Sequence, residues 1–89
     1  MRNVIINLIN RVIIPKYGPI RFNVVHTNDL HAPGLGYEVT YSLDEKLSKK
    51  IREEIITDTK MLLQMIGMFD IAGLHTSEYI WVSGLEDTK

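Results

Sequence analysis

The stretch SLDEKLSKKIREEIITDTKMLLQMIGM, residues 42–68, decides how we expect the chain to fold. Ser42 and Glu45 have the spacing of a capping box, in which two side chains bond the first free backbone N–H groups of a helix. Apolar residues then recur at helical spacing: Leu47, Ile51, Ile55, Leu62 and Met65 or Ile66. Gly67 is typical of a helix end. We therefore predict one long helix from Ser42 to Met68.

The second half of this predicted helix is apolar on more than one side. Ten of the fourteen residues from Met61 to Leu74 are apolar. The helix would be on the order of 37 Å long, whereas a six-residue strand spans only ~20 Å. We therefore expect the helix to overhang its sheet, and its free end to contact another molecule, because methionine suits adaptable contact surfaces. The residues of this predicted contact are Met61, Met65, Met68 and the adjoining Phe69.

A second helix is predicted near the start of the chain, from Arg2 to Ile14. Its polar residues fall at helical spacing: Asn3, Asn7, Asn10 and Arg11. Eight of the eleven residues from Val4 to Ile14 are apolar, so more than one side must be covered. We expect Ile5 and Ile9 to take part in contacts with a partner. Pro15 and Pro19 should end this helix and force an extended connector.

Three segments alternate between apolar and polar residues, as half-buried strands do. They are Ile20–Thr27, Tyr37–Ser42 and Glu78–Ser83. The first two are joined by Asn28–Gly36, which is longer than the commonest hairpin loops. Because a strand-helix-strand crossover joins parallel strands, we expect the third strand to run parallel to the second and to lie beside the first, in the spatial order 2-1-3.

The predicted fold is a single α+β domain spanning residues 1–89. It is a two-layer α/β sandwich of order α-β-β-α-β, with a three-stranded, mainly antiparallel sheet and both helices on one face. The opposite face should carry Arg21, Asn23, Val25, Glu38, Thr40, Tyr79 and Trp81. A shift of one residue in the third strand would instead move Tyr79 and Trp81 inside.

Composition places the chain among globular proteins, with 45% apolar and 24% charged residues. The absence of cysteine excludes disulfides and thiolate metal sites. We find no signal-peptide pattern, and the apolar tracts are too short to span a bilayer, so we expect an intracellular, cytoplasmic protein or a component of a virus-like assembly. The first 28 residues carry four basic and no acidic side chains, and the remainder carries six basic and eleven acidic ones. Such asymmetry favours an acidic partner or the acidic half of another copy of the chain, unless folding interleaves the charges and leaves no patch.

One short motif suggests a metal site. His26-Thr27-Asn28-Asp29-Leu30-His31 follows a predicted strand and resembles the first metal-ligand motif of 5′-nucleotidase-type metallophosphoesterases. The resemblance implies metal ligation at the positions of Asp29 and His31, but that family needs further ligands from later segments of a larger scaffold, which this chain lacks. A simpler site from His26, Asp29 and His31 is chemically reasonable. We nevertheless expect no functional metal there.

Motifs for catalysis are weak. Gly34-Leu35-Gly36 precedes a strand and lacks a lysine, so it is typical of a turn and not of a phosphate-binding loop. His75, Thr76, Ser77 and Glu78 form a polar cluster that is more typical of a loop before a strand than of a catalytic group. We therefore expect no enzyme activity, no cofactor and no small-molecule substrate.

Two functional hypotheses remain. The first is a structural or assembly subunit that self-associates or docks into a larger protein assembly, through the first helix and the methionine-rich end of the second. Small subunits of virus tails and necks share this general layout, which is an analogy of fold alone. The second is a single-stranded nucleic-acid binder that uses Arg21, Asn23, Tyr79 and Trp81 on an open sheet face. The net charge of −1 argues against the second.

Overall fold

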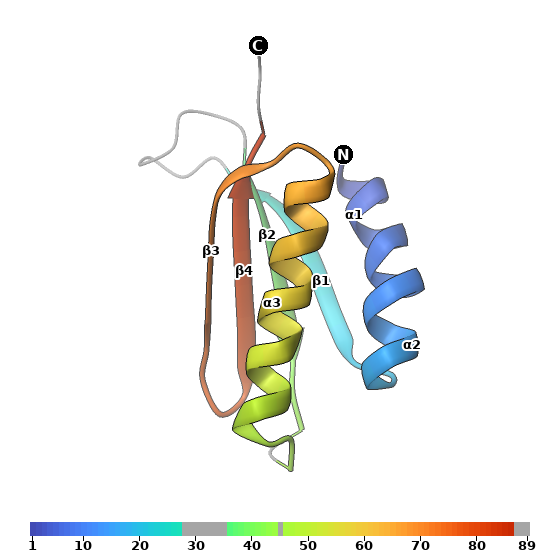
Figure 1. Ribbon diagram of the computed structural model, residues 1–89, viewed down its shortest axis with the longest axis vertical. Helices are drawn as coiled ribbons and strands as arrows, with labels where there is room; N and C mark the ends of the chain where they lie inside the picture. Colours follow the sequence, from blue (N-terminus) through green and yellow to red (C-terminus); the bar gives the residue numbers. More distant parts are fainter. Residues whose placement is uncertain (28–35, 45, 87–89) are drawn as a thin grey trace.

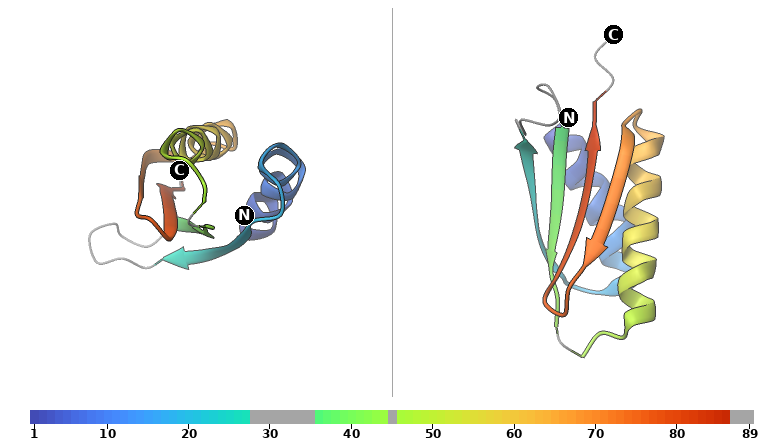
Figure 2. Two further views of the ribbon diagram at one scale, coloured as in Figure 1. Left: turned by 90° about the horizontal axis from the view of Figure 1, so that it is seen from below. Right: turned by 90° about the vertical axis from the view of Figure 1, so that its left-hand side faces the viewer.

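The computed structural model describes residues 1–27, 36–44 and 46–86. In chain order its elements are α1 (Arg2–Leu8), η1 (Ile9–Ile13), α2 (Ile14–Tyr17), β1 (Arg21–Thr27), β2 (Gly36–Ser42), α3 (Lys49–Met65), β3 (Phe69–His75) and β4 (Tyr79–Leu85) (Figure 1). The strands form one antiparallel sheet in the order β1-β2-β4-β3. Both the N-terminal helix and α3 lie on one face of this sheet (Figure 2). The α+β class is thus confirmed, but the sheet has four strands and not three.

The N-terminal helix runs further than the sequence indicates. It continues through Pro15 to Tyr17, whereas we expected Pro15 to end it. A proline inside a helix lacks the N–H donor and crowds the carbonyl group four residues earlier. Here the turn just before Pro15 widens to π-helix, in which Ile14 N–H donates to the carbonyl of Ile9, and this wider turn accommodates the ring. The helix ends at Gly18, whose φ of 93° suits glycine.

The long helix α3 begins six residues later than predicted, because Ser48 and not Ser42 is its N-cap. The Ser48 hydroxyl accepts a hydrogen bond from Ile51 N–H at 3.2 Å, whereas Ser42 is the last residue of β2. The 17 residues of α3 span about 26 Å. This length is close to the ~24 Å of a seven-residue strand. The predicted overhang of the helix is therefore wrong.

Strand β3 was not predicted from the sequence. It contains Ala72 and Gly73, which disfavour strands. The segment is held in the sheet by antiparallel pairing with β4. The crossover through α3 joins β2 to β3, which run parallel with β4 inserted between them. Strand β4 is therefore antiparallel to β2, and the predicted order 2-1-3 with a parallel pair is wrong.

The core lies between the sheet and the helices. Alternate strand residues point into it and are buried: Val24, Val39, Tyr41, Ile80 and Val82. From the helical side they meet Ile5, Ile9, Ile13, Ile55 and Leu63. Helix α3 crosses β3 so closely that a Cβ atom on Gly73 would lie 2.8 Å from Cγ2 of Ile56. The intervening strand residues point away from the helices, and the predicted assignment of Tyr79 and Trp81 to the outer face is therefore confirmed.

Candidate interaction surface

The sheet face opposite the helices, which we call the outer face, is the main candidate site. Strand pairing aligns its side chains in rows across the sheet. The first row is Arg21, Ser42 and Tyr79; the middle row is Asn23, Thr40, Trp81 and Leu74; the third row is Val25, Glu38, Ser83 and Ala72. The last row, at the ends of the strands beyond the third, is Thr27, Gly36, Leu85 and Phe69. No helix in the described part of the chain covers this face (Figure 2). The outer face therefore presents a continuous surface built from all four strands.

Large apolar and aromatic side chains stand at the centre and on one side of the outer face. Tyr79 and Trp81 lie on the inner strand β4, with ring centroids 5.6 Å apart and planes tilted by 35°. Leu74, beside Trp81 on the edge strand β3, is 57% exposed, and Tyr79 is 40% exposed. Trp81 itself is half-buried. A cluster of this kind is the surface feature that marks contact sites more reliably than scattered single apolar residues.

Charge is sparse in the three rows. Arg21 and Glu38 are their only charged members. Glu38 pairs with Val25, whose Cα atom lies four residues, or roughly 13 Å, along β1 from that of Arg21. Within the part of the chain that the structure describes, neither forms an ion pair. The three rows are thus neutral overall, with one positive charge in the first row and one negative charge in the third.

The predicted contact at the methionine-rich end is only partly available on the surface. Met61, Met65 and Phe69 are exposed, Met65 to 77%. Met68 is only 4% exposed, because the chain reverses at Gly67 and returns Met68 to the sheet. For Met61, Met65 and Phe69, contact with another molecule remains a prediction.

The first helix supplies two corrections. Ile5 and Ile9 are each 1% exposed and belong to the core of the single chain. They are therefore not accessible to a partner, and neither is Met68. The apolar side chains of this helix pack against the sheet and α3, because the helix contacts both β1 and α3.

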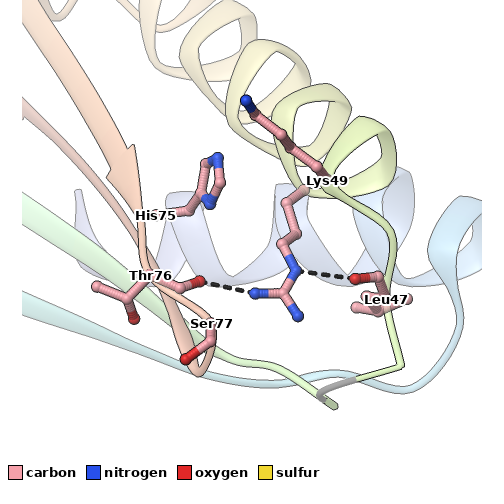
Figure 3. Close-up of a pocket in the computed structure, with 6 residues that line it drawn as sticks. Leu47, Lys49, His75, Thr76 and Ser77 are labelled. Carbon is pink, nitrogen blue, oxygen red and sulfur yellow. Dashed lines mark hydrogen bonds between the residues drawn. The ribbon is translucent and has the colours of Figure 1, made fainter.

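A pocket of about 330 Å³ lies between the start of α3 and the β3–β4 turn (Figure 3). The buried side chain of Arg52 lines it, and its guanidinium donates to the carbonyl of Leu47 at 3.0 Å and to that of Thr76 at 2.7 Å. These bonds join the segment before α3 to the turn between two strands. Because a buried guanidinium is costly unless bonded, we assign Arg52 a structural role.

The polar cluster after β3 forms a turn. The Thr76 hydroxyl accepts hydrogen bonds from the backbone N–H groups of Glu78 and Tyr79. His75 and Ser77 line the pocket of Arg52. In the described residues no hydrogen bond joins His75 to a hydroxyl group.

Of the predicted metal motif, only its first residues fall within the described chain. His26 lies at the end of β1, where its ring contacts Tyr37 at a centroid distance of 5.0 Å. Asp29 and His31 lie outside the described residues. Among residues 1–27, 36–44 and 46–86, no group of three potential metal ligands converges.

Two polar contacts tie the helices to the rest of the fold. Lys16 and Tyr17 both hydrogen-bond the carboxylate of Asp58 on α3. Partial burial raises the pKa of Asp58, but the bonds from Lys16 and Tyr17 outweigh this effect and lower it. In the core, burial raises the pKa of Tyr41, whose hydroxyl lies 2.8 Å from that of Thr59. These contacts stabilise the fold, and none of them involves a side chain of the outer face.

Comparison with known proteins assigns no family. No protein-family model, no curated protein and no solved structure matches the chain. No helix within the described ranges is both long enough and apolar enough to cross a membrane.

Proposed function

We propose that this chain is a non-enzymatic assembly subunit that associates with other copies of itself through the outer face. The observation that carries the proposal is the low charge of that face around an aromatic and apolar group. The side of a sheet that faces water usually carries polar and charged residues. Here Tyr79, Trp81 and Leu74 take the central and edge positions instead.

The composition of the outer face matches that of protein interfaces. Interface cores are depleted in charge and enriched in tyrosine and tryptophan, with polar residues around them. Residues that contribute most binding energy lie near the centre of the contact. Trp81 holds that position, in the middle row on an inner strand. We therefore expect Trp81 to be the main anchor.

The size of the outer face predicts a weak, reversible association. Four strands at ~4.8 Å and seven residues at ~3.4 Å give a face of about 19 by 24 Å, or roughly 460 Å² in projection. Such an area lies below the ~600–1,000 Å² per partner of stable protein interfaces and in the range of transient ones. We therefore expect monomers and oligomers in equilibrium at micromolar concentrations.

The exposed residues Met61, Met65 and Phe69 supply a second surface, at the far end of α3 from the Arg52 pocket. Two separate contact surfaces on one chain allow an assembly to grow beyond a dimer. This surface has the adaptable methionine side chains that suit docking. We propose it as the contact with a larger assembly.

The test is molar mass by light scattering over a concentration series, in low and high salt. We expect the mass of the wild-type protein to rise with concentration. Leu74→Arg should remain monomeric over the same range, because it places a charge in a desolvated interface. Asn7→Arg, an equal change of charge at an exposed position of α1 on the helical side of the sheet, is the matched control and should behave as wild type. A wild-type protein that is monomeric throughout contradicts the proposal.

A second candidate function is favoured by one observation. The Tyr79 and Trp81 rings form a tilted pair on a face that also carries Arg21 and Asn23, which resembles a stacking platform for single-stranded nucleic acid. Phosphate contacts usually dominate such affinity, and the three rows carry no net charge. Titration of Trp81 fluorescence with a short single-stranded oligonucleotide at low salt tests this candidate, and an unchanged signal removes it.

A further inference from the structure

We propose that two copies pack their outer faces together about a two-fold axis perpendicular to the strands, so that Arg21 of each copy pairs with Glu38 of the other. This inference rests on the proposed self-association and specifies its geometry. It is carried by the positions of the only two charges in the three rows.

The rows of the outer face determine what such an axis brings together. The first and third rows lie at equal distances on either side of the middle row, two residues away along each strand. A two-fold axis along the middle row therefore exchanges the first and third rows. It places Glu38 of the second copy over Ser42, and Ser42 is the residue paired with Arg21 across β1 and β2. Neighbouring strands are ~4.8 Å apart, a distance that an arginine side chain spans.

The same axis places the residues of the middle row over their own copies. Trp81 then meets Trp81 of the second copy, and Leu74 meets Leu74, so the large apolar side chains of the face are buried together. Sheets packed face to face keep their strands nearly aligned, about 10 Å apart, with interdigitated side chains. Aromatic side chains of this size fill that spacing.

The charges also exclude the other simple orientation. A two-fold axis parallel to the strands keeps each row in register with itself. Arg21 of each copy would then lie among the first-row residues of the other, and Glu38 among the third-row residues, so neither charge would find an opposite charge. Unpaired charges in an interface are costly, and opposite charges fix the register of partners.

A second copy is the occupant that this charge pattern fits. The three rows are neutral overall, and the axis exchanges the row of the positive charge with the row of the negative charge, so these rows are complementary to themselves. Within one chain the two charges do not pair, and among the described residues neither has an ionic partner. Pairing across the two-fold axis forms two ion pairs, each between Arg21 of one copy and Glu38 of the other.

Charge reversal tests the geometry with the full-length chain. We expect Arg21→Glu and Glu38→Arg each to weaken self-association at least tenfold in sedimentation velocity, because each change puts like charges opposite one another. An equimolar mixture of the two variants should associate again, since both cross-pairs in the mixed dimer are then of opposite sign. The double variant carrying both changes should also associate, because its charges are exchanged and remain complementary.

Matched controls separate this geometry from general charge effects. Lys50→Glu and Glu53→Arg reverse exposed charges on α3 by the same amounts and should associate as wild type, alone or mixed. Unchanged thermal unfolding of all variants establishes that they fold. A wild-type protein that never associates overturns the proposed function itself. The geometry is overturned if the wild-type protein associates and the single variants associate equally well. It is also overturned if the mixture of the two variants associates no better than each variant alone. Either result would mean that self-association uses another surface.

Discussion

Two methionines near the end of α3 differ sharply in their surroundings, and lysine substitution should separate them. Met65 is 77% exposed, whereas Met68 is 4% exposed. Cβ and Cε of Met68 both lie 3.4 Å from the position that a Cβ atom on Gly84 would occupy, so this side chain packs directly on β4. The reversal at Gly67, with its φ of 88°, fixes Met68 in that position.

The expected effects follow from this burial. Met68→Lys introduces an unpaired buried charge, which typically costs about 3–5 kcal/mol. In a domain of this size each kcal/mol lowers the melting temperature by roughly 4–8 °C, so the fall should be at least about 12 °C. Met65→Lys should change stability by no more than ~0.5 kcal/mol, as exposed substitutions usually do. Met68→Leu keeps an apolar side chain and should cost less than ~1.5 kcal/mol.

Thermal unfolding followed by circular dichroism measures these effects. The protein should be diluted until it is monomeric, so that the loss of an intermolecular contact does not contribute. A melting temperature that falls equally in Met65→Lys and Met68→Lys would refute the assignment of one side chain to the surface and the other to the core.

Three further predictions concern the packing of α3. Gly73→Ala should destabilise the fold by about 1–3 kcal/mol in chemical denaturation, because the new Cβ atom would lie 2.8 Å from Cγ2 of Ile56; an unchanged midpoint would contradict the close approach. Tyr41→Phe should cost about 1–3 kcal/mol by leaving the buried Thr59 hydroxyl without its partner, and combining it with Thr59→Val should cost less than the sum of the two single changes. The pKa of Asp58 is lowered in the folded state, so its stabilising contribution should be present above the unfolded pKa of about 3.9 and be lost as the pH falls through the folded value; Asp58→Asn should flatten that part of the pH profile of stability.

The sequence predicts the outer face best along β2, where Tyr37, Val39 and Tyr41 alternate with Glu38, Thr40 and Ser42, and a shift by one residue would expose the whole apolar set. In β4, by contrast, Tyr79 to Val82 are apolar or aromatic on both faces. The side on which Tyr79 and Trp81 lie therefore follows from the burial of Ile80 and Val82 in the folded chain.

The boundaries of the helices were less predictable, since several residues offer equivalent local signals. Ser42 and Ser48 both have the character of an N-cap, and only the pairing of Ser42 in β2 decides between them. Pro15 would end an isolated helix, but burial of the helix against the sheet favours its continuation through a widened turn.

Strand β3 was missed because its sequence contains a weak strand signal. Ala72 and Gly73 disfavour strands, and the apolar run from Met61 continues into this segment without a break in composition. The available signal was the short polar turn that begins at Thr76, between two segments of equal length. Missing β3 also hid Leu74, which extends the apolar part of the outer face to the edge of the sheet.

The burial of Trp81 on association is the quantity to measure. It is the only tryptophan in the chain, so its fluorescence reports on the outer face alone. We predict that quenching by acrylamide decreases as protein concentration rises, with the same midpoint as the increase in molar mass. A molar mass that doubles while the quenching of Trp81 stays constant would show that the chain associates through another surface, and would contradict the assignment of the outer face as the interface.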